Sequence, residues 1–103
     1  MSDASALTNE QAKLAELRRE IEAIDVALID LLAKRLVCAA QIGQVKQQLG
    51  LPVLDPAREA EVVRRAAELA RERGFDPELA RDVIWRIMAQ ARHTQRAGTI
   101  SSE

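Results

Sequence analysis

Four polar side chains stand where the helical pattern of this sequence requires apolar ones. Arg35 occupies an apolar stripe, and Lys46 follows 11 residues later, about 20° away around the helix axis. Glu59 heads the stripe of the next helical segment, and Gln95 continues the stripe of the last one. Two long cations at this spacing can hold opposite ends of a small anion. Buried cations need partners, and Glu59 cannot neutralise both, so the pattern predicts a pocket for a dianion.

Each of these residues has an ordinary explanation when it is taken alone. An arginine on a stripe is commonly a snorkelling or register residue. A lysine in a last turn and a glutamate in a first turn both interact favourably with the helix dipole, and a glutamine near a helix end commonly frays. Four such residues on inward faces together favour a binding site.

Arg18 extends the set in a different way. It precedes Arg35 by 17 residues, which places it about 26 Å away along one helix and about 100° around the axis. It therefore cannot serve the same pocket within one chain. In an antiparallel dimer it could reach the pocket of the partner subunit.

The first helical segment is too long for the rest of the chain to cover. From about residue 9 to residue 49 there is no proline, and apolar residues recur in alternating steps of three and four. At about 1.5 Å per residue this helix would be roughly 60 Å long, about twice the width of a 100-residue globule. We call its apolar face the seam; its apolar members are Leu14, Leu17, Ile21, Ile24, Leu28, Leu31, Cys38, Ile42, Val45 and Leu49. An uncovered seam predicts a homodimer in which two copies lie along each other.

Two shorter helices complete an all-α chain of three helices. Asp55-Pro56 and Asp76-Pro77 each supply a capping residue followed by a proline suited to a first turn. Gly74 ends the second helix, and the third should run to about Arg96. We expect a helical domain over residues 9–96, with disordered ends at 1–8 and 97–103.

The composition excludes several classes of function. The chain has 103 residues, 15 basic and 16 acidic, which fits one domain without the basic field of a nucleic-acid-binding protein. A single cysteine suits a reducing compartment, and neither a membrane-spanning run nor a signal peptide is seen. We expect a cytoplasmic protein that binds no membrane. With His93 expected in solvent and no second ligand at suitable spacing, we expect no metal site, and no cofactor motif is present.

These residues resemble the all-α class of chorismate mutase, a small intertwined helical homodimer. The similarity runs without a gap from Arg18 to Gln95, and the matching pieces are "LRREIEAID" (Leu17 to Asp25), "LLAKR" (Leu31 to Arg35), "IGQVK" (Ile42 to Lys46), "DPARE" (Asp55 to Glu59) and Gln95. The resemblance implies rearrangement of chorismate, a dicarboxylate, to prephenate in phenylalanine and tyrosine biosynthesis. This one-step pericyclic reaction needs no nucleophile, metal or cofactor.

The resemblance also implies roles for individual residues. Arg35, with Arg18 of the other subunit, binds the two carboxylates of the substrate. Lys46 and Gln95 donate hydrogen bonds to the ether oxygen of the breaking bond, where negative charge grows.

On the opposite side of the substrate, the resemblance implies that Glu59 receives the ring hydroxyl. Asp55 helps to hold that side, and Arg58 supports the carboxylate end. Ala91 departs from the family, which often has a small hydroxyl residue one turn before the glutamine, so one polar contact is absent.

Three alternatives stay open at the level of sequence. Two are sister activities on the same scaffold, an isochorismate pyruvate-lyase and a 4-amino-4-deoxychorismate mutase. The Asp-x-x-Arg-Glu block favours a mutase over the lyase, whereas Ala91 leaves the amino analogue open.

The third alternative is a non-enzymatic helical dimer that serves as a regulatory or docking module. Such a module would not need inward Lys46, Glu59 and Gln95. Feedback regulation, a partner enzyme, and the choice between primary and secondary metabolism also stay open.

Overall fold

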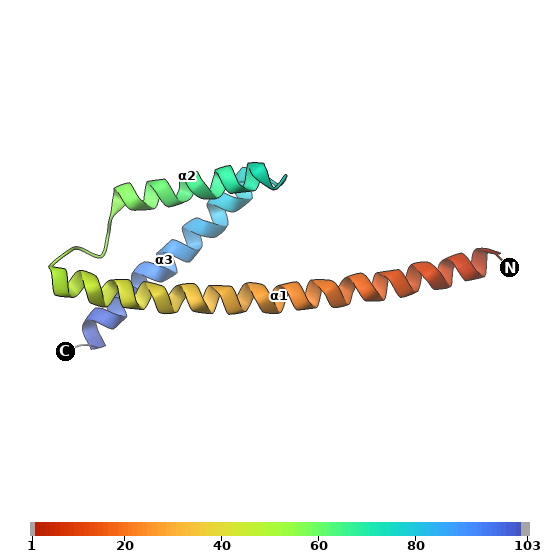
Figure 1. Ribbon diagram of the computed structural model, residues 1–103, viewed down its shortest axis with the longest axis horizontal. Helices are drawn as coiled ribbons and strands as arrows, with labels where there is room; N and C mark the ends of the chain where they lie inside the picture. Colours follow the sequence, from red (N-terminus) through yellow and green to blue (C-terminus); the bar gives the residue numbers. More distant parts are fainter. Residues whose placement is uncertain (1, 102–103) are drawn as a thin grey trace. The chain divides into compact units, whose positions relative to one another are not determined.

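The computed structural model describes the backbone of residues 2–101 and the side chains of residues 3–96. Within that part of the chain it contains three helices and no strand (Figure 1). These are α1 (Ser2–Leu49), α2 (Pro56–Glu72) and α3 (Pro77–Ser101). The all-α class and the three predicted helices are confirmed.

The chain divides by its internal contacts into two units, and the boundary along the sequence lies between Lys34 and Arg35. The first unit is the N-terminal part of α1, and its described side chains are exposed except for the half-buried Leu32. The second unit contains the last turns of α1 together with α2 and α3. It contains the buried side chains and the pocket described below.

Helices α1 and α3 extend beyond the predicted domain. Helix α1 begins at Ser2 rather than near residue 9, with Asp3 in its first turn, where a carboxylate suits the helix dipole. The Thr8 hydroxyl also donates to the Ala4 carbonyl oxygen at 2.9 Å. The polar side chain is therefore hydrogen-bonded within the helix itself. The structure is thus helical at 2–8 and 97–101, where disorder was expected. Residues 1, 102 and 103 lie outside the described part.

The starts and stops of the shorter elements follow local chemistry. The Asp55 Oδ1 atom accepts from the Arg58 backbone N–H at 3.1 Å and caps α2 ahead of Pro56. Asp76 caps α3 in the same way, with Oδ1 2.9 Å from the Glu78 nitrogen. Gly50 after α1 and Gly74 after α2 adopt φ of 69° and 78°, which only glycine takes without strain. The signals at Asp55, Asp76 and Gly74 were predicted from the sequence.

The buried interior of the second unit consists of small side chains and one methionine. The buried hydrophobic residues are Ala39, Ala67, Ala70, Met88 and Ala91. Small residues allow helices to approach closely, and one close approach is at Gly43, where an added Cβ would lie 2.9 Å from the Gln95 Cα. Cys38, a member of the predicted seam, is exposed, as are the large apolar residues of the seam. Among the described helices, none has the length and apolarity that crossing a membrane requires.

Candidate active site

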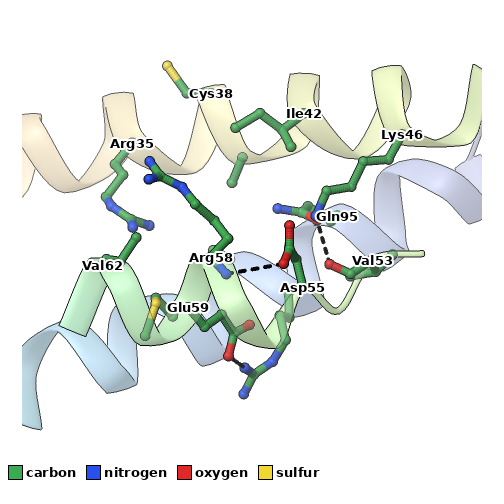
Figure 2. Close-up of a pocket in the computed structure, with 14 residues that line it drawn as sticks. Arg35, Cys38, Ile42, Lys46, Val53, Asp55, Arg58, Glu59, Val62 and Gln95 are labelled. Carbon is green, nitrogen blue, oxygen red and sulfur yellow. Dashed lines mark hydrogen bonds and ion pairs between the residues drawn. The ribbon is translucent and has the colours of Figure 1, made fainter. Parts of the chain in front are cut away.

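A pocket of about 340 Å³ lies in the second unit, lined by side chains of α1, α2, α3 and the α1–α2 connection (Figure 2). Six of the seven site residues expected from the sequence line it: Arg35, Lys46, Asp55, Arg58, Glu59 and Gln95. The seventh, Arg18, is exposed in the first unit. Helices far apart in sequence therefore bring the inward polar residues to one place.

The lining of this pocket has an excess of positive charge. Four cationic and two acidic side chains line it, so its formal charge is +2. The remaining wall is mostly apolar and includes Ile42, Val62 and Met88. A small dianion with an apolar ring would match both properties.

Lys46 and Gln95 form the polar end of the pocket. The Lys46 ammonium donates to the Val53 carbonyl oxygen at 2.7 Å and to Gln95 Oε1 at 3.2 Å. Gln95 is 8% exposed, so its amide is held in a nearly closed position. Since Oε1 faces Lys46, the donor nitrogen of the amide points away from it, as Figure 2 shows. The pair thus supplies a charged donor and a neutral donor at the same end of the pocket.

Two of the three arginines that line the pocket, Arg35 and Arg58, are held loosely. Among the described side chains, Arg35 forms no hydrogen bond or ion pair, and it is half-buried. Arg58 pairs with Glu61 at 3.3 Å, but both side chains are largely exposed, at 66% and 59%. Exposed pairs of this kind contribute little stability. Both guanidinium groups can therefore turn toward an anionic ligand at small cost.

Glu59 lines the pocket, and its ion-pair partner, Arg92, was not expected from the sequence. The Glu59 Oε1 atom accepts from Arg92 Nη1, and the two side chains are 16% and 21% exposed. The Glu59 carboxylate points away from α1 in Figure 2. The Arg92 guanidinium also lies over the Trp85 ring, 5.7 Å from its centroid, at a distance typical of cation–π contact.

Arg92 is the lining residue that sequence reasoning missed. The available signal was its spacing, because Arg92 follows Met88 by four residues and precedes Gln95 by three. It therefore continues the inward stripe of α3 opposite Glu59. Among the described side chains, no group of three His, Cys, Asp or Glu residues could hold a metal ion.

Comparison with protein families identifies the chain's relatives. The family model of chorismate mutase type II matches residues 17–96. The chain belongs to this family. The matched range contains all seven expected site residues, Arg18 included.

Individual chorismate mutase relatives agree with this assignment. A T-protein of Enterobacter agglomerans is 42% identical over 80 residues, which cover 78% of this chain and 21% of the relative. A chorismate mutase of Methanocaldococcus jannaschii is 39% identical over 64 residues, which cover 62% of this chain and 65% of the relative. The match thus spans about a fifth of the T-protein and less than two thirds of the M. jannaschii enzyme. A 4-amino-4-deoxychorismate mutase of Streptomyces venezuelae is 36% identical over 67 residues, 65% of each chain.

One solved structure also resembles the chain. A conserved hypothetical protein from Pyrococcus furiosus superposes with a TM-score of 0.66 and 38% sequence identity. The match covers 81% of this chain and 95% of that one. The fold of this chain therefore also occurs in a solved protein.

Proposed function

We propose that this chain catalyses the rearrangement of chorismate to prephenate. One observation carries the proposal: a single pocket with a formal charge of +2 contains the Lys46–Gln95 pair and four more of the expected site residues. Membership of the chorismate mutase type II family supports the same reaction. The reaction is intramolecular: an ether C–O bond breaks while a C–C bond forms, and no group is transferred to the protein.

Lys46 and Gln95 act at the breaking ether bond. Negative charge grows on the ether oxygen as the bond breaks, and fixed donors lower the barrier when they are already in place. The ammonium of Lys46 and the amide nitrogen of Gln95 are such donors, and the hydrogen bond between the two side chains orients them before substrate binds. Confinement of a flexible dianion in its reactive shape supplies the other part of the rate enhancement.

The two carboxylates of the substrate bind to arginines. Arg35 supplies a planar fork that suits bidentate contact with a carboxylate, and Arg58 supports the same end. Arg18 reaches the pocket from the partner subunit in this proposal. On the other side of the ring, Glu59 accepts the substrate hydroxyl and Asp55 helps to hold that wall.

The homodimer is part of the same proposal. Every large apolar residue of the predicted seam is exposed in the structure: Leu14, Leu17, Ile21, Ile24, Leu28, Leu31, Ile42, Val45 and Leu49. An apolar surface of this extent is unusual for a monomer and typical of an interface. A second copy that covers the seam would also bring its own Arg18 to a pocket. We further propose a cytoplasmic role in phenylalanine and tyrosine biosynthesis.

A second candidate is the rearrangement of 4-amino-4-deoxychorismate. Ala91 is buried on the pocket wall, at a position where the resemblance to the family implies a small hydroxyl residue. A relative named 4-amino-4-deoxychorismate mutase is also 36% identical to this chain.

Product identification separates these functions. Purified protein is incubated separately with chorismate, isochorismate and 4-amino-4-deoxychorismate, and the products are identified by mass spectrometry and NMR. We expect prephenate from chorismate as the fastest reaction. Pyruvate release from isochorismate would indicate the lyase, and faster turnover of the amino compound would indicate the second candidate. No turnover of any compound would contradict an enzymatic role.

A further inference from the structure

The ion pair between Glu59 and Arg92 changes what the ring side of the pocket can accept. Both residues line the pocket, and both side chains are largely buried, at 16% and 21% exposed. A partly buried pair is poorly screened by solvent, so its charges affect nearby ligand groups more strongly than a surface pair would.

We propose that Arg92 is a positioning residue that makes this site select a ring hydroxyl over a ring ammonium. The proposal rests on the proposed function, in which the substrate group at this position meets Glu59. Arg92 acts through Glu59, by binding one of its two carboxylate oxygens.

Hydrogen-bonding capacity explains why a hydroxyl fits. Arg92 Nη1 donates to Glu59 Oε1, and an ionised carboxylate has a second oxygen with its own lone pairs. That second oxygen can accept the hydrogen of a substrate hydroxyl while Arg92 keeps the first. A neutral hydroxyl adds no charge, so the carboxylate remains balanced by the guanidinium.

Charge explains why an ammonium does not fit. An aliphatic amine is cationic at neutral pH, as a lysine side chain is. Beside Glu59 the substrate ammonium would meet a carboxylate whose charge Arg92 already balances. The Arg92 guanidinium, a like charge, would also lie close to it. Buried like charges without compensation are strongly unfavourable. A substrate with two carboxylates and one ammonium also has a net charge of −1, which leaves the +2 pocket unbalanced.

Trp85 fixes the position of the arginine in this arrangement. The guanidinium lies 5.7 Å from the centre of the Trp85 ring, so cation–π contact stabilises it where it pairs with Glu59. Trp85 is itself 54% exposed. Its contact with Arg92 gives this surface residue a role in holding the guanidinium.

Substrate competition tests the proposal. The values of kcat/KM for chorismate and 4-amino-4-deoxychorismate are measured for the wild type, Arg92→Met, Arg92→Gln and Arg92→Lys, with helical content checked by circular dichroism. Removal of the Arg92 charge should raise the amino-to-hydroxyl ratio by about tenfold or more. Arg92→Lys keeps a cation beside Glu59 and should retain the low wild-type ratio.

A matched control uses the arginine one turn later. Arg96 lines a second groove, which Glu59 and Trp85 also line. Its side chain is exposed. Arg96→Met removes the same charge from the surface and should leave the ratio within about twofold of wild type, because exposed charges are screened. General damage to the fold would lower both activities together and would not move the ratio.

The outcomes separate this inference from the proposed function. Wild-type turnover of chorismate with an unchanged ratio in Arg92→Met and Arg92→Gln overturns the inference alone. A wild type that converts neither compound overturns the proposed function and this inference with it. If Arg92→Met does not fold, the decision falls to Arg92→Gln, which keeps a donor for Glu59 without the charge.

Discussion

Gln95 and Lys46 differ in one property that matters for catalysis at the residue scale. The amide of Gln95 cannot ionise, whereas the ammonium of Lys46 supplies charge, and the two are joined by a hydrogen bond of 3.2 Å. Two donors of this kind serve the ether oxygen across neutral pH. We therefore expect the rate of the wild type to be nearly flat between about pH 6 and 8, because the amide of Gln95 donates at any pH.

Replacement of Gln95 by glutamate should introduce a pH dependence. An ionised carboxylate only accepts hydrogen bonds, so Gln95→Glu places an acceptor beside the growing negative charge unless it is protonated. A free glutamate has a pKa of about 4.3. As the pH falls toward this value, a growing fraction of the introduced carboxyl is protonated, so the variant should regain activity. At neutral pH we expect a loss of about 100-fold or more, the usual cost of one donor to a developing oxyanion.

The measurement is a pH–rate profile of kcat/KM on chorismate for both proteins, with folding checked at each pH. Gln90→Glu is a suitable control, because residue 90 is exposed on the same helix. Wild-type activity of Gln95→Glu at neutral pH would remove Gln95 from the chemistry. Parallel profiles would remove the protonation argument.

At the scale of elements, the close approach at Gly43 places Gln95 beside Lys46. An added Cβ at Gly43 would lie 2.9 Å from the Gln95 Cα and 3.0 Å from its carbonyl oxygen. Backbone atoms cannot move aside as a flexible side chain can. The absence of a side chain on α1 therefore allows α3 to present its amide to the pocket.

Gly43→Ala should therefore damage the site in spite of its better helix propensity. We expect kcat/KM on chorismate to fall at least about tenfold, since small misplacements of catalytic groups are costly. Overpacking should cost about 1–3 kcal/mol of stability, against a helix-propensity gain of about 1 kcal/mol. Urea unfolding and steady-state kinetics measure the two effects.

Gly74→Ala is the matched control for this variant. Gly74 has φ of 78° and no atom near an added Cβ, so its replacement strains the backbone after α2 without contacting Gln95. It should lower stability and leave kcat/KM nearly unchanged. Full activity of Gly43→Ala would show that the approach of the helices does not position Gln95.

The sequence predicted the elements better than it predicted their contacts. The helix starts at Pro56 and Pro77 could be predicted because Asp55 and Asp76 act on their own next turns. The start of α1 at Ser2 was missed because weak helix formers such as Thr8 were interpreted as a frayed end, although its hydroxyl is satisfied within the helix.

Contacts between elements were predicted only where the polar residue broke an apolar stripe in an obvious way. Arg35, Lys46, Glu59 and Gln95 did so, and one pocket contains all four. Arg92 also lies on the stripe of α3, but it was not singled out because an arginine near the end of a charged helix is usually solvated. Its pairing with Glu59 depends on how α2 and α3 face each other, which local pattern does not specify.

At the scale of the whole molecule, the exposed seam predicts an obligate homodimer. Burial of its apolar side chains would supply most of the free energy of association, at about 25 cal/mol per Å² removed from water. Sedimentation velocity at about micromolar concentration should show a single dimeric species, as expected of a dimer whose Kd lies well below about 1 μM. A folded monomer under these conditions would contradict the prediction.

The shared site predicts complementation between two inactive variants. Arg18→Ala and Arg35→Ala should each be nearly inactive, and their mixture should regain activity after joint refolding. A heterodimer would contain one pocket with both arginines and one with neither. Proven heterodimers without activity would show that Arg18 does not act in the pocket of the partner subunit.

The central claim is that the pocket containing Lys46 rearranges chorismate, and one comparison tests it most directly. The consumption of chorismate is followed spectroscopically for the wild type and Lys46→Met. This variant removes the ammonium that donates to Val53 and Gln95 but keeps an apolar side chain of similar length. We predict prephenate formation by the wild type and a fall in kcat/KM of about 100-fold or more in a folded variant. Chorismate turnover by Lys46→Met at the wild-type rate, or none by the wild type, would contradict the claim.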